Sequence, residues 1–474
     1  MTDKNNINIQ VKASIWYTIC NFYQKGISFI VVPIYTRLLT TAEYGQWSVF
    51  QSWRDILIIF ASLNLYCGVY TKTLVDIKKE DRDYYTASMQ GLGTIFTLGF
   101  AIIYLCFSPS FLRLLELNTQ EMWLLILYFV LYPAFSFWST RQRVEYKYRE
   151  MVFVTIVVSI LTPVISLLLL FTTSLRSGAL IYGYLLVQCG IGGIFYVLQF
   201  IKGRCFFDKG YWKYALKFNI PLIPHYLSLI VLAQSDRIMI KYFCSNSDAG
   251  IYSFAYQIAS ALGIFITAIN GSRVPWTYEK LKAKNFSRLK PIANALSILM
   301  GILVVALSLV TPELIAILGT QKYLRAEMVI PIVALGVYFT FCYDLFCTVE
   351  FYFGATNYVM IASVTGAILN IILNWIFIPI YGFIAAAYTT LICYILFMLA
   401  HCFFMNKTLK KEHIYESVYD LKRIFIISII TCIFTILCML IYSLWFVRYG
   451  IVIVVLILLF INRNKINHML KEIK

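Results

Sequence analysis

The chain has 474 residues, of which 60% are hydrophobic, 17% are aromatic and only 13% are charged. Soluble domains carry about 45–50% apolar and about 25% charged residues, so the composition excludes a soluble globular protein and predicts an all-α polytopic membrane protein. The start, MTDKNNINIQVK, lacks an apolar core followed by a cleavage site. We therefore expect no removable signal peptide, and the first span itself would direct insertion.

Apolar runs of about 20 residues, the length that crosses about 30 Å of hydrocarbon, recur along the whole chain. They predict fourteen transmembrane helices, the last of which is short, near 13–34, 45–70, 88–108, 121–140, 151–172, 178–201, 219–242, 250–272, 291–311, 328–352, 357–379, 382–405, 423–445 and 449–462.

The formal net charge of +17 follows the predicted topology. Connecting segments on one side of the membrane hold 30 Lys and Arg residues, and those on the other side hold 6. Because cytoplasmic loops carry the excess of Lys and Arg, both termini are predicted to be cytoplasmic. The basicity is therefore a topology signal, and nucleic acid is not an expected partner.

An internal repeat divides the predicted spans. TAEYGQWSVF at 41–50 and NSDAGIYSFA at 246–255 match at four positions with one offset of 205 residues. Six spans separate the copies, an even number that preserves direction, so we expect parallel repeats around a central cavity. The predicted organisation is an N-lobe over 1–212 (spans 1–6), a C-lobe over 213–407 (spans 7–12), and two further spans with a cytoplasmic tail over 408–474.

Nothing in the chain resembles a catalytic centre. It has no nucleotide-binding loop, no metal-ligand spacing and no G-x-S-x-G elbow, and its twelve cysteines scatter through the spans as small hydrophobes. We therefore expect no enzymatic activity, no cofactor and no metal site. Any energy source would be an ion gradient or the consumption of product downstream.

Two segments carry a family resemblance. PIYTRLLTTAEYG (33–45) follows a first span with polar and charged residues, and PLIPHYLSLIVLAQSDRIMI (221–240) forms the seventh span. Both resemble Wzx-type O-antigen flippases, in the oligosaccharidyl-lipid branch of the superfamily that also contains multidrug exporters. The resemblance covers nearly the whole chain. It implies movement of a polyprenyl-diphosphate-linked oligosaccharide from the cytoplasmic to the periplasmic leaflet of the bacterial inner membrane, for O-antigen or capsule polymerisation. It also implies the lipid bilayer and the downstream glycan polymerase as partners.

Cations inside the first two spans fit such a cargo. A charge at the bilayer centre costs at least about 2.5–3.5 kcal/mol, so Lys25 and Arg54 need a polar interior. Asn21 lies one helical turn before Lys25 on the same face. We expect these residues to bind the diphosphate or an acidic sugar. The alternative is a structural pair between Lys25 and Asp55, and Asp55 is also a candidate for coupling or for locking the lobes.

Span 7 carries a second set. His225, Ser228 and Asp236 share one helix face, because eleven residues make almost a whole number of turns. Arg237 is rotated by about 100° from Asp236, so the two are not expected to pair. His225 and Arg237 are candidate substrate contacts, and Asp236 is a candidate for coupling or lobe locking.

Span 10 carries Asp344 and Glu350, candidates for proton or cation coupling because intramembrane carboxylates can form proton relays. Glu350 lies near the predicted cytoplasmic end, and the alternative for it is simple contact with water. Trp53 and Trp138 have two possible roles, stacking on sugar rings or packing against lipid.

Two other functions compete. A multidrug or organic-cation antiporter of the same superfamily would favour an acidic cavity, whereas here Lys25, Arg54 and Arg237 balance three deep acids. A surface-glycan polymerase or ligase would carry a large periplasmic loop, whereas the longest outer loop, 312–327, has only 16 residues. Both comparisons favour a flippase.

Overall fold

A computed structural model describes residues 2–451 and 453, and every regular element in these residues is helical. The predicted all-α membrane class is confirmed. Eleven of the described helical segments are long and apolar enough to cross a membrane. Two more long helices, α1 (Thr2–Leu38) and α2 (Thr41–Ser62), carry the polar and charged residues of the first predicted spans. Most of the fourteenth predicted span, 449–462, lies outside the described residues.

The described chain clusters into two compact units, which we call unit 1 (Met1–Val31 and Gln46–Gln234) and unit 2 (Val32–Gly45 and Ser235–Lys474). The boundaries fall inside α1, α2 and α10 (Ile223–Phe243), so three helices contribute to both units. The predicted lobe limits at 212 and 407 stay predictions.

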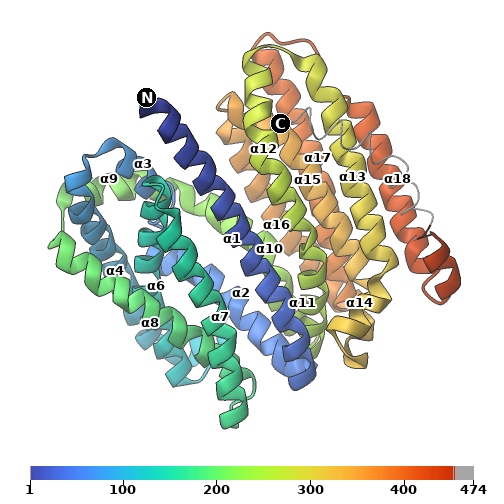
Figure 1. Ribbon diagram of the computed structural model, residues 1–474. Helices are drawn as coiled ribbons and strands as arrows, with labels where there is room; N and C mark the ends of the chain where they lie inside the picture. The colour runs from blue at the N-terminus through green and yellow to red at the C-terminus, as the bar shows by residue number, and fades with distance from the viewer. Residues whose placement is uncertain (1, 452, 454–474) are drawn as a thin grey trace. The chain divides into compact units, whose positions relative to one another are not determined.

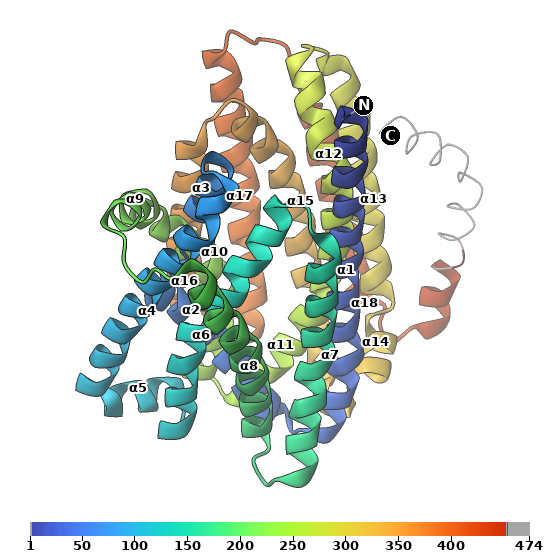
Figure 2. The ribbon, with the colours of Figure 1, turned by 60° about the vertical axis from the view of Figure 1, so that its left-hand side comes forward.

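Unit 1 is a helical bundle in which α8 (Ser177–Gly203) packs against three neighbours. Figure 1 shows α4, α6 and α8 side by side, and in Figure 2 α5 and α9 lie at opposite ends of α4. The remaining helices of unit 1 are α3 (Val69–Asp76), η1 (Lys79–Asp81), α4 (Arg82–Cys106), α5 (Ser108–Leu115), α6 (Thr119–Val144), α7 (Tyr148–Thr172), α9 (Lys209–Asn219) and η2 (Ile220–Leu222).

Unit 2 is built around α15 (Ile330–Tyr352), most of whose residues are buried because helices cover it on several sides. Its main partners are α11, α12, α13 and α17. The other helices of unit 2 are α11 (Asn246–Ser260), α12 (Leu262–Lys282), η3 (Phe286–Arg288), α13 (Leu289–Leu309), α14 (Thr311–Leu318), η4 (Gln321–Met328), α16 (Thr356–Tyr381), α17 (Ile384–Lys411) and α18 (Leu421–Leu440).

The internal repeat recurs in the helix boundaries. The helix before each copy ends at Leu38 or Phe243, and the helix that follows begins at Thr41 or Asn246, both pairs with the predicted offset. The caps repeat as well. The backbone N–H of Glu43 donates to the Thr40 hydroxyl (3.2 Å), and the backbone N–H of Asp248 donates to the Ser245 hydroxyl (3.0 Å).

The two repeated helix starts pack against each other within unit 2. A Cβ on Gly45 would lie 1.7 Å from the Asn246 carbonyl oxygen, and one on Gly250 would lie 2.0 Å from the Thr41 carbonyl oxygen. The hydroxyls of Thr41 and Ser247 are 2.7 Å apart at the same crossing. Only glycine lets the two backbones approach so closely, which explains why the repeat contains glycine at both positions.

Two predicted spans differ from the structure. The span predicted over 45–70 stops at Ser62, where Leu63 and Asn64 adopt positive φ and end the helix. The apolar composition of 65–70 concealed this break. The span predicted over 250–272 instead continues through α12 to Lys282. Arg273, which the predicted spans place in the connecting segment 273–290, therefore lies within a helix.

Candidate functional site

Lys25 and Asn21 lie on α1 in unit 1, and both side chains are exposed. Lys25 makes no ion pair with any residue that the structure describes. The structural alternative, a pair between Lys25 and Asp55, is therefore not found, because Asp55 has a different partner. The exposed Lys25 ammonium, on a long helix of mixed polarity, is open to contact with water or with an anion.

Arg54 is the partner of Asp55. Its Nη2 lies 2.6 Å and its Nε 2.9 Å from Asp55 Oδ1. The two adjacent residues of α2 therefore form an ion pair in which two guanidinium nitrogens donate to one carboxylate oxygen. Gln234 Nε2 donates to the second oxygen, Asp55 Oδ2, over 3.1 Å. Arg54 itself is buried, and its Nη1 has no hydrogen-bond partner. The pair thus leaves one donor of a buried cation unused.

Aromatic rings surround this cation. The Arg54 guanidinium lies 4.5 Å from the centre of the Tyr184 ring, within the range of a cation–π contact. The hydroxyls of Tyr128 and Tyr184 are 3.4 Å apart, and Tyr128 stacks on Tyr132. The cluster combines a cation with aromatic faces and hydroxyls, the groups that bind anionic and sugar-like ligands.

The two other predicted substrate contacts have less distinctive surroundings. His225, on the unit 1 part of α10, is half-buried and lies beside Tyr226, with 6.0 Å between the ring centres. Arg237, on the unit 2 part of α10, is buried and lies 4.4 Å from the centre of the Tyr256 ring.

Asp236 is a fully buried predicted site residue, with no exposed surface. Three neutral donors from three other helices satisfy it. The Tyr252 hydroxyl donates to Oδ2 over 2.5 Å and the Thr390 hydroxyl over 2.9 Å, while Asn374 Nδ2 donates to Oδ1 over 2.7 Å. Asn370 extends this network by donating to Thr390 (2.9 Å). A carboxylate held by neutral groups changes its net charge when it takes up a proton or cation, as a coupling residue must.

Asp344 pairs with a cation that the sequence reasoning missed. Arg273 Nη2 lies 2.6 Å from Asp344 Oδ2, and Asn270 Nδ2 donates to the same oxygen over 2.7 Å. The Arg273 side chain is 3% exposed and that of Asp344 31%. Because this carboxylate is already neutralised by a cation of its own unit, it is less suited to coupling than Asp236.

Glu350 lies away from water, contrary to the simpler alternative offered above. It has no exposed surface, and its Oε1 lies 3.0 Å from His401 Nδ1. Glu350 Oε2 and His401 Nε2 are both buried without a hydrogen-bond partner. The His401 ring also stacks on Tyr343, at 5.4 Å between ring centres. A buried acid–base pair with two polar atoms that have no hydrogen-bond partner is a further coupling candidate.

Sequence reasoning did not assign the partners of these charged residues, among them Arg273, His401, Asn374 and Tyr184. Two were visible in principle. Asn370 and Asn374 lie one helical turn apart in an apolar span, and two amides on one face indicate a polar contact. His401 is a histidine near the end of predicted span 12 (382–405). Tyr184 carried no signal, because tyrosines are frequent throughout this chain.

Comparison with solved structures defines the fold. The structure of the lipid II flippase MurJ in an inward closed conformation matches with a TM-score of 0.71 and 15% identity, over 95% of this chain and 100% of that one. An inward-facing multidrug resistance MATE family transporter of the MOP superfamily matches with a TM-score of 0.59 and 13% identity, over 81% and 96%. The chain therefore has the fold shared by these two structures.

Family models and sequence relatives give the narrower assignment. The model for polysaccharide biosynthesis proteins matches residues 11–279, and the MatE model matches residues 221–376. An uncharacterized membrane protein of Haemophilus influenzae is 24% identical, over 76% of this chain and 88% of its own length. The Lsg locus putative protein 1 of the same organism is 22% identical, over 76% and 89%. The chain belongs to the polysaccharide biosynthesis protein family, which confirms the resemblance to Wzx-type proteins of this superfamily.

Proposed function

We propose that this protein is a flippase that moves a polyprenyl-diphosphate-linked oligosaccharide from the cytoplasmic to the periplasmic leaflet of the bacterial inner membrane, with both termini in the cytoplasm. The observation that carries the proposal is the pair of cations on α1 and α2, in a member of the polysaccharide biosynthesis family. Lys25 is exposed without an ion pair in the described residues, and Arg54 keeps an unused donor.

The chemistry of the cargo explains why such cations are needed. A diphosphate cannot cross hydrocarbon unless cations replace its hydration. The sugars need hydrogen-bonding and stacking partners, and the prenyl tail stays in lipid. Lys25 offers three rotatable donors and Arg54 a planar donor. Tyr184, Tyr128 and Tyr132 offer rings and hydroxyls beside Arg54. Asn21 extends the polar face of α1 next to Lys25.

We assign energy coupling to unit 2. Asp236 and the Glu350–His401 pair are buried groups whose charge changes with proton or cation uptake, whereas Asp344 is balanced by Arg273. Alternating access would follow if uptake at these groups shifts the balance between two conformations that differ in their affinity for the cargo.

A genetic experiment tests the proposal. In a bacterium that carries this gene, deletion should abolish surface-glycan display, lipid-linked oligosaccharide should accumulate in the inner leaflet, and the intact gene should restore display. Retention of normal display after deletion would contradict the proposal.

Export of organic cations is a second candidate, because the MatE model matches 221–376, the segment that holds Asp236 and Asp344. The same deletion strain separates the two functions. Sensitivity to organic cations with intact glycan display would favour the exporter, whereas loss of display with unchanged sensitivity would favour the flippase.

A further inference from the structure

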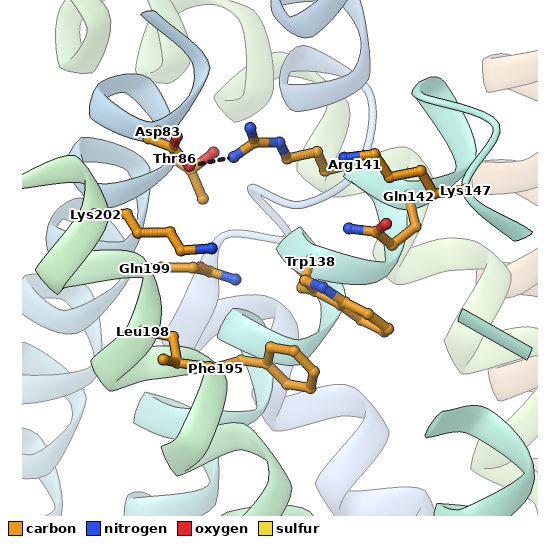
Figure 3. Close-up of a pocket in the computed structure, with 10 residues that line it drawn as sticks. All are labelled: Asp83, Thr86, Trp138, Arg141, Gln142, Lys147, Phe195, Leu198, Gln199 and Lys202. Carbon is orange, nitrogen blue, oxygen red and sulfur yellow. Dashed lines mark hydrogen bonds and ion pairs between the residues drawn. The ribbon is translucent and has the colours of Figure 1, made fainter. Parts of the chain in front are cut away.

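A second basic site in unit 1 is lined by residues other than Lys25 and Arg54. The ends of α4, α6 and α8, together with the segment that enters α7, enclose a cavity of about 170 Å³. This is far larger than the roughly 10–15 Å³ that one water molecule needs. The lining combines cations, amides and rings: Asp83, Thr86, Trp138, Arg141, Gln142, Lys147, Phe195, Leu198, Gln199 and Lys202 (Figure 3).

The cations of this cavity exceed its anions. Arg141, Lys147 and Lys202 line it together with one carboxylate, Asp83. Outside the lining, Glu145 contacts Arg82 (3.2 Å), Lys147 (2.8 Å) and Arg141, and Arg141 also pairs with Asp83. Although burial opposes ionisation, hydrogen bonds from Lys147 and Arg141 lower the pKa of Glu145 to about 2. Glu145 is thus ionised under all ordinary conditions. Lys202, on the last turn of α8, makes no ion pair in the described residues, so the cluster keeps an excess of positive charge.

Donors that no protein group uses point to an anionic ligand. Arg141 uses Nε and Nη1 for Glu145 and Asp83, and its Nη2 has no partner among the described residues. The Lys202 side chain extends into the cavity in Figure 3, close to Gln199 and facing Arg141 and Gln142. An ammonium, a guanidinium edge and an amide that surround one space form the donor set that binds a phosphate group.

The opposite side of the cavity is apolar. Trp138 stacks on Phe195 with 4.4 Å between ring centres, and Leu198 lies next to them. This side continues onto a strongly exposed apolar strip of α8 formed by Ile194, Val197 and Ile201. On a membrane-spanning helix such a strip contacts acyl chains. A soluble anion would gain nothing from these groups, whereas a lipid uses both the cations and the strip.

We propose that this cavity binds the phosphate headgroup of an anionic membrane phospholipid, with Lys202, Lys147 and Arg141 around the phosphate and the acyl chains along α8. Basic pockets between membrane helices on the cytoplasmic side suit such headgroups, and the Lys and Arg bias places this end of the helices at the cytoplasmic face. The proposal does not depend on the oligosaccharide site, because neither Lys25 nor Arg54 lines this cavity.

Binding of phosphatidylglycerol to the detergent-purified full chain, measured by native mass spectrometry against phosphatidylcholine, tests this site. The K202Q/K147Q double variant should bind phosphatidylglycerol at least about tenfold more weakly, since each basic residue near a lipid surface contributes substantially. The matched control is K213Q/K217Q, which removes two exposed lysines of α9 on the same predicted side. The control should bind like the unaltered protein.

Three results would overturn the proposal: equal phosphatidylglycerol binding by the double variant and the control, no preference for phosphatidylglycerol over phosphatidylcholine, or full displacement of the lipid by equimolar inorganic phosphate. The last result would assign the site to a soluble phosphate. If the double variant does not fold, K202Q alone serves, because Lys202 is exposed and makes no ion pair in the described residues. It should weaken phosphatidylglycerol binding by about fivefold, and unchanged binding would also overturn the proposal.

Discussion

Unit 1 leaves Lys25 exposed on α1 without an ion pair among the described residues, whereas unit 2 places each of its deep acids beside a partner within the same unit. An unused donor on a buried guanidinium occurs in both units, at Arg54 Nη1 and at Arg273 Nη1. Asp344 has Arg273, Glu350 has His401, and Asp236 has three neutral donors. The difference suggests a division of labour in which unit 1 offers positive charge to a cargo and unit 2 stores protonatable groups. Variants that change the charge or the packing of one unit test this difference.

The largest expected loss of stability is in unit 2. R273M leaves Asp344 without its cation, and we expect the free energy of unfolding to fall by about 2–3 kcal/mol, less than the 3–5 kcal/mol of a fully buried pair because Asp344 is partly exposed. Thermal unfolding of the purified protein measures the effect. The double variant R273M/D344L should recover most of the loss, and K282M, at an exposed position of the same helix, should be neutral. A neutral R273M would mean that unit 2 does not depend on internal charge pairing.

A slightly smaller effect is expected at the crossing of the two repeated helix starts. G45A or G250A would place a Cβ within 2.0 Å of a backbone oxygen, which requires the helices to separate and costs about 1–3 kcal/mol. G99A, in the middle of α4 with no atom within 4 Å of its Cβ, is the control. It should be stabilising by about 0.5–1 kcal/mol. If all three variants melted alike, the close crossing would not be a feature of the folded protein.

D236N tests whether the buried acid of unit 2 serves transport more than folding. The hydroxyls of Tyr252 and Thr390 can accept as well as donate, so an amide can replace the carboxylate at a cost of about 1 kcal/mol. We expect glycan display to fall by at least about tenfold while the protein level changes little, because an amide cannot take up a proton or bind a cation as a carboxylate does. Normal display in cells that produce D236N would remove Asp236 from the coupling group.

The smallest effect on stability is expected for K25Q. An exposed side chain outside the described ion pairs contributes within about 0.5 kcal/mol, so the melting temperature of K25Q should match that of the unaltered protein. A clear loss of stability would show that Lys25 has a structural partner and would remove the contrast between the units.

The sequence predicted most helices because apolar runs of spanning length carry their own signal. It predicted the repeat because four residues, Gly45 and Gly250 among the matches, recur at one offset. It did not predict the end of α2 at Ser62, since Leu65, Tyr66 and Cys67 read as further span. The sequence also did not predict which residues on different helices contact each other. Arg273 and Asp344 are 71 residues apart, and Glu350 and His401 are 51 apart.

The candidate site was therefore predicted as single residues rather than as clusters. Lys25, Arg54, Asp236 and Glu350 are visible from sequence because a charge in an apolar run is unusual. Their roles depend on neighbours that only tertiary packing supplies. The cavity between α4, α6 and α8 shows the same limit, because Arg141 and Lys202 looked like ordinary topology-determining charges until the folded helices brought them together.

Surface-glycan display by Lys25 variants, at matched protein levels, is the most direct test of the claim that unit 1 presents positive charge to an anionic cargo. We predict that K25A and K25Q lose display and that K25R retains it, because charge at this position is the property used. Normal display by K25Q would contradict the account.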